Sequence, residues 1–307
     1  MRPLLALAAV LLAAGCLGAN EGPAAPTPAR ELALEAPWWN IGESWTIRFT
    51  QGGSGTRTTT LVNFANNTFG DPPHFWLGTA DRQEALDHVF YDNNPFLGRI
   101  HWVLLAPHEK GMHSTMYEWP LKDGATWTSP ILFGHNDILV SASARPDGSF
   151  AIKGQARADG APLEYDYDPA VRWFRQLKID EGRKLSAEVT DHKESGARGT
   201  YYFLRGRDYL DAAGGSTGDE RPFTVRDEGA TSIAFRLDVR TSGPAALEFV
   251  DPSGAAVHRE ALPLGGAANK VVEVKQPPAP GEWKMRYVGT VQGSVLVRGI
   301  IEYKATI

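Results

Sequence analysis

Alternation of apolar and polar residues constrains the fold of this 307-residue chain more than any other feature. In the C-terminal third, Ile233, Phe235, Leu237 and Val239 alternate with polar or small residues. This period of two is typical of a strand with one buried face. Similar runs follow, separated by turn segments such as the Asp-Pro-Ser-Gly sequence at 251–254. We therefore expect an antiparallel β-sandwich over residues 219–307.

Residues 36–210 also indicate a mainly β fold. Asp81 to Glu84 has the form of a capping box, and the apolar residues behind it predict a short amphipathic helix: Ala85, Leu86, Val89 and Phe90. Later runs predict successive antiparallel strands joined by tight turns, at 137–145, 149–157, 162–167, 172–179, 183–191 and 198–204. These elements predict an antiparallel half-barrel-like domain with one or two short helices.

Two segments lack strand periodicity and suggest the domain limits. Residues 16–35 are rich in Ala, Pro and Glu, a composition typical of an extended stalk. Residues 211–218 are rich in Gly and indicate a flexible linker. The predicted organisation is a signal peptide (1–15), a stalk (16–35), a half-barrel-like domain (36–210), a linker (211–218) and a sandwich (219–307).

The N-terminus has the pattern of an export signal, with Arg2, an apolar run at 4–14 and small residues before Cys16. Cys16 is the only cysteine of the chain. The sequence at 12–16 resembles the lipobox of bacterial and archaeal lipoproteins, although Ala13 stands where that family usually has Leu. The resemblance implies that Cys16 carries membrane lipid and holds the protein at the outer face of the cytoplasmic membrane. The alternative is an incidental cysteine in a signal peptide cut further on, for example after Ala19.

Two further resemblances concern the predicted domains. The sequences at 117–127 and 167–174 are similar to those of uncharacterised exported half-barrel proteins. Some relatives of that architecture are lipid or lipoprotein carriers, which implies a concave face able to hold acyl chains. The run at 247–254 followed by 280–283 resembles secreted sandwich modules of the pre-peptidase or jelly-roll kind. That resemblance implies a fold rather than a function.

The charge balance and the aromatic content limit the classes of function that this chain can have. The chain has 31 basic and 36 acidic side chains and no basic domain, which argues against nucleic-acid binding. We expect a non-enzymatic binding or scaffolding protein that uses no cofactor and holds an apolar or amphiphilic ligand in the N-terminal domain. Trp76 and Trp102, on either side of the predicted helix, are the candidate ligand-binding residues. A protein partner is also compatible with this role.

Two alternative functions stay open at this point. The sandwich could bind carbohydrate through Trp283 and Tyr287, if their side chains are exposed. A metal-dependent hydrolase is the other alternative, because six of the eight histidines fall within 62 residues. The sequence His-Glu-Lys-Gly-Met-His at 108–113 is one residue too long for the zinc motif H-E-x-x-H. We therefore expect no metal, with His101, His108 and His113 as the residues to check.

Of three other motifs, two have simple structural explanations. Ser216 lies in a G-x-S-x-G sequence, but the predicted linker explains the match better than a nucleophile elbow. Glu164, Asp166 and Asp168 would project from one side of one strand, which favours a solvated face over a Ca²⁺ site. Asn66 lies in an N-x-T tripeptide and is a candidate for glycosylation.

Overall fold

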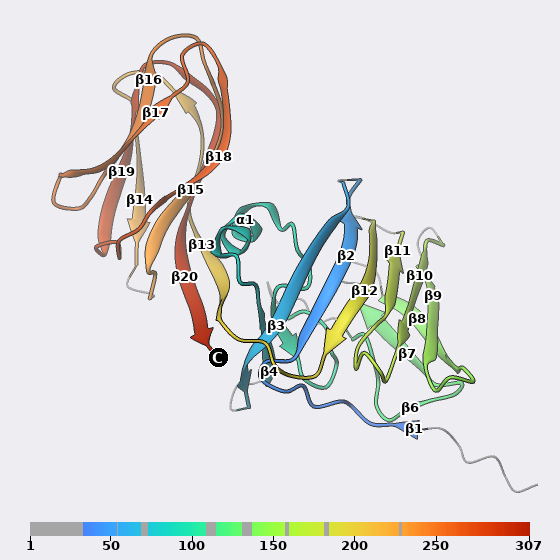
Figure 1. The fold of residues 1–307 in the computed structure, drawn as a ribbon. Helices are drawn as coiled ribbons and strands as arrows, with labels where there is room; N and C mark the ends of the chain where they lie inside the picture. The colour runs from blue at the N-terminus through green and yellow to red at the C-terminus, as the bar shows by residue number, and fades with distance from the viewer. Residues whose placement is uncertain are drawn as a thin grey trace, which may run out of the picture. The chain divides into compact units, whose positions relative to one another are not determined.

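The computed structural model describes residues 33–53, 55–68, 73–108, 115–130, 137–156, 160–180, 184–226 and 229–307. Its described residues form a mainly β fold, as expected from the sequence (Figure 1). Cys16, the predicted signal peptide and nearly all of the predicted stalk lie outside the described residues. His113 also lies outside them.

The larger sheet has ten strands in the order β5-β4-β3-β2-β12-β11-β10-β9-β8-β7, and every pair is antiparallel. Its two edges are different strands, so the sheet is open. Its strands are β2 (Ser44–Gln51), β3 (Arg57–Asn67), β4 (His74–Gly78), β5 (Gly98–His101), β7 (Thr126–Pro130), β8 (Asp137–Ala144), β9 (Phe150–Ala156), β10 (Pro162–Tyr167), β11 (Gln176–Ile179) and β12 (Leu185–Lys193). A separate short pair joins β1 (Ala33–Leu34) to β6 (Leu121–Lys122).

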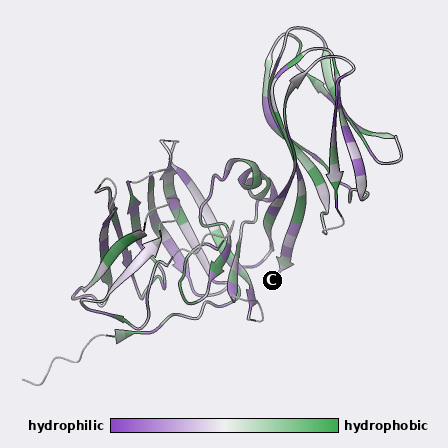
Figure 2. Cartoon of the chain, turned by 180° about the vertical axis from the view of Figure 1, so that it is seen from behind, coloured by the Kyte–Doolittle hydropathy of each residue, from purple (hydrophilic) through white to green (hydrophobic). Residues whose placement is uncertain are grey.

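Buried and exposed side chains alternate along the strands, so the two faces of this sheet differ. On β2, Trp45, Ile47 and Phe49 are buried, whereas Arg48 is exposed. Figure 2 shows the same alternation as hydrophobic and hydrophilic bands along the strands. We call the face that carries Trp45 the inner face and the face that carries Arg48 the outer face.

The inner face is packed with aromatic side chains. Trp39 lies 4.4 Å from Trp45 and 5.0 Å from Trp173, measured between ring centroids. Phe96 extends this cluster toward Trp173 at 5.7 Å, and Phe174 lies 5.1 Å from Phe96. All five rings are fully buried. Over the described residues, the inner face is therefore a filled hydrophobic core rather than an open cup.

Irregular segments cover this core, and hydrogen bonds from buried aromatic side chains hold them in place. The indole Nε1 of Trp45 donates to the carbonyl of Val171 at 2.9 Å, and that of Trp173 donates to Leu105 at 3.1 Å. The hydroxyl of Tyr117, in the irregular segment before β6, donates to the carbonyl of Asp166 on β10 at 2.7 Å. Buried aromatic N–H and O–H groups thus connect the irregular segments with the sheet and with one another.

The predicted helix is confirmed as α1 (Arg82–Tyr91). The carboxylate of Asp81 caps it by accepting from the backbone N–H of Gln83, and its buried residues are the four expected apolar ones. The side chain of Glu84 does not bind the backbone N–H of the cap residue Asp81, as it would in a capping box. Its carboxylate accepts instead from the hydroxyls of Thr59 and Thr79, each at 2.8 Å. Glu84 therefore connects the helix to β3 and to the residue after β4.

The C-terminal residues form two four-stranded sheets, with the orders β13-β20-β15-β18 and β14-β19-β16-β17. Phe235 and Phe249, from different sheets, stack at 4.4 Å in the core between them. This arrangement is consistent with the expected β-sandwich. Its strands are β13 (Thr200–Gly215), β14 (Glu220–Val225), β15 (Ser232–Thr241), β16 (Ala245–Val250), β17 (Ala256–Leu262), β18 (Ala267–Val274), β19 (Gly281–Val288) and β20 (Val291–Thr306).

The glycine-rich segment 211–218 differs from the expected linker. Residues up to Gly215 complete β13 and pair with β20, and only 216–218 form a turn. A Cβ atom on Gly214 would lie 2.1 Å from the carbonyl oxygen of Val291, and one on Gly215 would lie 2.7 Å from the ring of Tyr287. These glycines serve close backbone packing, and not chain flexibility.

The predicted strand at 172–179 is also shorter than expected. Only Gln176–Ile179 is strand. Arg172 has a φ of 63°, a left-handed conformation that interrupts the strand, and Trp173 forms an isolated bridge with Asp168. This turn carries Trp173 into the aromatic core.

A substitution at Gly214 tests the packing role of the glycine pair. Gly214→Ala should lower the free energy of unfolding by about 2 kcal/mol, because the new methyl group would overlap the backbone of β20. Gly243→Ala is the matched control, since a Cβ atom added there would have no atom within 4 Å. Urea unfolding of both variants measures the difference. Equal stability of the two would contradict close packing at Gly214.

Candidate functional site

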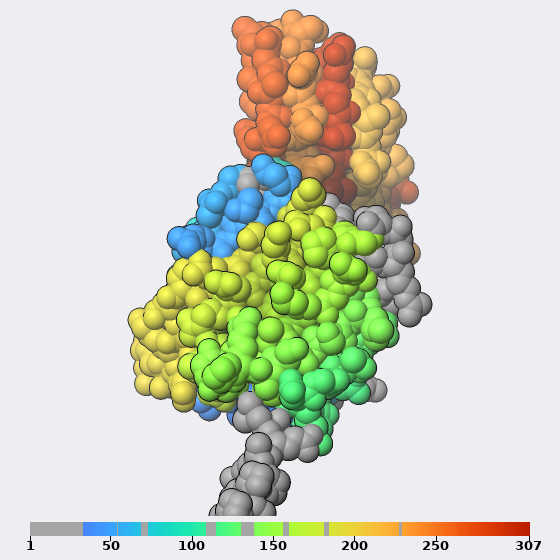
Figure 3. Space-filling view, turned by 90° about the vertical axis from the view of Figure 1, so that its right-hand side faces the viewer, coloured from blue at the N-terminus to red at the C-terminus, as the bar shows by residue number. Residues whose placement is uncertain are grey.

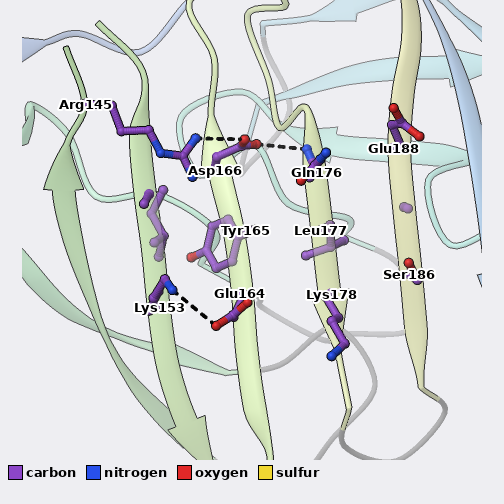
Figure 4. A pocket seen from close by; sticks show the side chains of 13 residues that line it. Arg145, Lys153, Glu164, Tyr165, Asp166, Gln176, Leu177, Lys178, Ser186 and Glu188 are labelled. Atoms are coloured by element: carbon purple, nitrogen blue, oxygen red, sulfur yellow. Dashed lines mark hydrogen bonds and ion pairs between the residues drawn. The ribbon is translucent and has the colours of Figure 1, made fainter. Parts of the chain in front are cut away.

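The outer face of the large sheet contains a groove of about 400 Å³. It crosses four neighbouring strands, β9 to β12, and Figure 4 shows its lining side chains. In Figure 3 the residues of β9 to β11, drawn yellow-green, lie together on one side of the molecule. The exposed side chains of the groove form a cross-strand row: Lys153, Glu164, Lys178 and Ser186.

Charges of both signs alternate along this row and are paired. The Nζ of Lys153 lies 3.4 Å from the carboxylate of Glu164, and that of Lys178 lies 3.0 Å from Asp180. The hydrogen bond with Asp180 raises the pKa of Lys178 above its usual value, so the ammonium stays charged. Exposed pairs such as these contribute little to stability and exchange readily with water or with a ligand.

The end of the groove is more rigid. Asp166 is buried, and its Oδ1 accepts from the backbone N–H groups of Arg175 and Gln176 at 2.7 and 2.9 Å. Its Oδ2 lies 3.3 Å from Arg145. The carboxylate thereby replaces a strand partner where β11 begins. A fixed end and an exchangeable row together make a surface with a defined shape and polar lining.

The three acids singled out in the sequence therefore have separate partners. Glu164 pairs with Lys153 and Asp166 with Arg145, as described above. Asp168 accepts from Arg175 at 2.5 Å and from the backbone N–H of Ala170 at 2.8 Å. Within the described ranges, no group of three or more His, Cys, Asp or Glu residues is placed to hold a metal ion.

A second polar cluster, not anticipated from the sequence, lies beside the aromatic core. Glu43 is fully buried, and its Oε2 lies 3.1 Å from Arg172 and accepts from the backbone N–H of Asn40 at 2.8 Å. Its Oε1 lies 2.9 Å from the Nε2 of His192. No sequence motif could reveal this cluster, because its members are 129 and 149 residues apart.

His192 contacts Glu43 from the other side. Its Nδ1 lies 3.1 Å from the carbonyl oxygen of Ala170, and its Nε2 lies 2.9 Å from the carboxylate of Glu43. The guanidinium of Arg172 pairs with the same carboxylate, so the three side chains form a structural clamp around the buried Glu43.

Three of the histidines from the sequence converge on β4 and β5. His74 pairs in register with His101, and their rings lie 6.2 Å apart. The ring of His108 lies 4.6 Å from that of His74. The Nδ1 of His101 accepts from the backbone N–H groups of Val103 and Leu104. His101 therefore has a structural role at the turn after β5.

The surroundings of His74 change its pKa. Burial, followed by the nearby His108, Arg99 and His101, lowers the pKa of His74 from 6.5 to about 4. Only 5% of the residue is exposed, and its Nε2 has no hydrogen-bond partner among the described residues. His74 is therefore neutral in the folded protein at pH 7.

The two tryptophans proposed as ligand-binding residues lie apart. Trp76 packs 4.5 Å from the ring of Tyr303 and 6.0 Å from that of Phe203. Trp102 lies 5.0 Å from Trp38, which in turn contacts Phe75 at 5.5 Å. Phe75 and Trp76 are consecutive on β4 and so point to opposite faces. The two side chains do not form one cup mouth.

Several other sequence expectations can be compared with the structure. Trp283 and Tyr287 are 3% and 1% exposed, so they are core residues and do not present a surface to glycans. Ser216 lies in the turn between β13 and β14, and no helix follows it as a nucleophile elbow requires. The amide nitrogen of Asn66 donates to the carbonyl of Trp39 at 3.1 Å. Glycosylation of Asn66 stays a prediction, and it would disrupt this hydrogen bond.

No helix in the described part of the chain has the length and apolar character needed to cross a membrane.

Comparison with known proteins gives no family. No protein-family model matches the chain, and no curated protein matches it. Among solved structures, the enzymatically active domain of tailspike protein 4 from bacteriophage CBA120 is similar over 55% of this chain and 18% of its own length, at 11% identity and a TM-score of 0.16. The chain thus spans less than a fifth of that protein.

A glycoside hydrolase family 43 arabinoxylan arabinofuranohydrolase from Bacillus subtilis is similar over 90% of this chain and 78% of its own, at 9% identity and a TM-score of 0.21. An exo-β-1,3-galactanase from Phanerochaete chrysosporium is similar over 81% and 67%, at 7% identity and a TM-score of 0.18. Scores this low do not establish a shared fold, so these similarities carry no argument about activity.

The environment of His74 predicts acid sensitivity. Its pKa is depressed in the folded state, so the unfolded chain binds the proton more readily between pH 6.5 and about 4. The stability that depends on neutral His74 is complete above pH 6.5 and is lost as the pH falls toward 4. Between pH 7 and 4.5 this loss should reach about 2 kcal/mol.

Urea unfolding at several pH values measures this effect. His74→Gln should flatten the pH dependence of the unfolding free energy relative to that of the native chain. Identical slopes in the native chain and in His74→Gln would contradict the assignment.

Proposed function

We propose that this chain is a lipid-anchored extracytoplasmic binding protein with a non-enzymatic role. Cys16 is the attachment point, supported by its position after the apolar run 4–14 and by the lipobox resemblance. Two acyl chains on one cysteine suffice for stable membrane attachment, whereas one gives only marginal binding. The domain that follows binds a ligand outside the membrane.

The groove on β9 to β12 is the observation that supports the binding role. The sequence suggested an apolar ligand on the inner face, but aromatic side chains fill that face over the described residues. The groove offers open volume with a polar lining, so the proposal places the ligand there. Its ligand is accordingly polar.

The lining of the groove indicates the chemistry of this ligand. Lys153, Glu164 and Lys178 alternate in sign across adjacent strands, which lie roughly 5 Å apart. An extended polypeptide with acidic and basic side chains can match this alternation. No exposed aromatic ring lies among the lining residues, because Tyr165 is buried, and so the stacking platform that sugar rings favour is missing from this lining.

Membrane attachment through Cys16 can be tested in the host. Cys16→Ser should move the protein from the membrane fraction to the soluble exported fraction, because it removes the thiol that carries lipid. Immunoblots of separated fractions, with mass spectrometry of the mature N-terminus, provide the measurement. An unchanged membrane fraction for Cys16→Ser would disprove attachment at this residue.

Ligand binding in the groove can be tested with defined probes. A mixed-charge lysine and glutamate peptide should bind the mature protein in isothermal titration calorimetry, whereas a neutral oligosaccharide should not. Lys178→Glu should weaken peptide binding about tenfold, since it places a like charge beside Glu164.

Lys304→Glu is the matched control for this measurement. Lys304 is similarly exposed on β20 and pairs with Glu302 at 3.1 Å, as Lys178 pairs with Asp180. The groove proposal fails if the peptide does not bind, or if both lysine variants weaken binding equally.

A further inference from the structure

Trp38, Trp102, Val103 and Trp119 form an exposed apolar surface, which we call the tryptophan patch. Trp38 is 45% exposed and Val103 is 39% exposed, whereas Trp102 and Trp119 are partly buried. The rings of Trp38 and Trp102 meet edge to face at 5.0 Å. The indole Nε1 of Trp119 donates to the carbonyl of Val103 at 2.6 Å. These contacts join the residues into one surface.

The patch is held in place by the core beneath it. The ring of Trp38 contacts the fully buried Phe75 at 5.5 Å, and Arg172 of the structural clamp donates to the carbonyl of Trp38. The ring of Trp119 lies 5.0 Å from that of Tyr167. Trp38 is thus fixed in an exposed position, although burying it would be favourable. Exposed apolar residues that gather in one patch are typical of an interaction surface.

The patch lies where the described chain begins. Leu34 of β1 pairs with Leu121 of β6. Trp38 follows Leu34 by four residues, and Trp119 precedes Leu121 by two. Two independent chain segments therefore place the patch beside the point at which the chain leads back to Cys16. Cys16 and Ala33 are 17 positions apart, so the chain between them spans at most about 60 Å when fully extended.

We propose that the tryptophan patch inserts into the headgroup region of the membrane to which Cys16 is attached. This inference rests on the lipid anchor proposed above. Tryptophan is enriched at membrane interfaces because its ring is apolar and its N–H is polar. A short tether also raises the effective concentration of the membrane surface at the patch to the millimolar range. Weak insertion then suffices to orient the protein on the bilayer.

Electrostatic attraction does not account for the proposed contact between the patch and the membrane. The chain carries a formal net charge of −5, so it has no overall attraction to anionic headgroups. The apolar contact should therefore occur on neutral phosphatidylcholine and change little with salt. A membrane is favoured over a soluble glycan because the patch adjoins the tether. Tryptophan also stacks on sugar rings, so a glycan is the competing outcome of the test.

The experiment uses the full lipidated protein in phosphatidylcholine vesicles whose acyl chains carry bromine near the headgroup. Bromine quenches tryptophan fluorescence at short range, so the native protein should be quenched relative to unbrominated vesicles. Val103→Asp retains all nine tryptophans but places a charge in the patch. It should reduce the quenching about threefold, because an aspartate opposes insertion.

Leu264→Asp is the matched control. Leu264 is 74% exposed in the turn between β17 and β18, and its substitution should leave quenching unchanged. Near-ultraviolet circular dichroism checks the fold of both variants. If Val103→Asp does not fold, Val103→Asn replaces it, with reduced quenching again expected.

Three outcomes would overturn the inference. In the first, the native protein floats with the vesicles but its fluorescence is not quenched, which means that the anchor is present and the patch does not insert. Equal loss of quenching in the Val103 and Leu264 variants shows that the effect is not specific to the patch. In the third, vesicles do not quench the fluorescence, but chitotetraose shifts the tryptophan emission of the native protein and not that of the Val103 variant. This result would identify the patch as a glycan-binding surface. If the protein does not float with the vesicles, the proposed lipid anchor is wrong. Flotation therefore distinguishes a failure of the anchor from a failure of the patch.

Discussion

The buried carboxylate of Glu43 is the interaction on which the N-terminal part of the structure depends. It binds Arg172 from the turn after β10, His192 from the end of β12 and the backbone of Asn40 before β2. Removing one partner of such a cluster leaves an uncompensated buried charge, which typically costs about 3–5 kcal/mol. Two of these chain regions, the start of β2 and the turn after β10, bring in Trp39, Trp45 and Trp173. The charge cluster and the aromatic core are therefore built from neighbouring residues of the same chain regions.

This core decides where function can lie. A ten-stranded sheet must cover its apolar face, and here the irregular segments between β5 and β7 and after β10 do so. Hydrogen bonds from tryptophan and tyrosine to backbone carbonyls hold these segments in place, which keeps buried polar groups satisfied. Because the inner face is filled over the described residues, the candidate recognition surfaces in that part of the chain are the polar groove on the outer face and the tryptophan patch at the chain entry.

The sequence predicted the parts of the fold that depend on local pattern. The helix at 82–91 followed from one capping residue and four apolar positions, and most strands followed from alternation. The clamp of Glu43, Arg172 and His192 could not be predicted, because its members are far apart and each resembles an ordinary surface residue in sequence. The tryptophans were equally ambiguous, since composition does not distinguish rings that fill a core from rings that line a cup.

Glycine composition was misleading for a related physical reason. The absence of a side chain permits both flexibility and close approach, and sequence composition cannot separate the two. At Gly214 and Gly215 the missing side chain allows neighbouring atoms to approach the backbone closely. Strand β13 therefore continues to pair with β20 where a linker was expected. Tyr201 and Phe203 at the start of β13 lie in the N-terminal core, while Ala212 near its end lies in the sandwich core.

One strand pair thus contributes to both cores. Ion pairs add to this connection, because Arg82 of α1 contacts Glu273 of β18 and Glu302 of β20 at 2.8 and 2.7 Å. Burial opposes ionisation of Glu273, but the hydrogen bonds from Arg82 and Ser232, together with the charges of Arg82 and Lys275, lower the pKa of that carboxyl. Bending between the two cores would break backbone hydrogen bonds and these partly buried ion pairs together. We therefore expect the sandwich to move with the N-terminal core, so a contact made by either one constrains both.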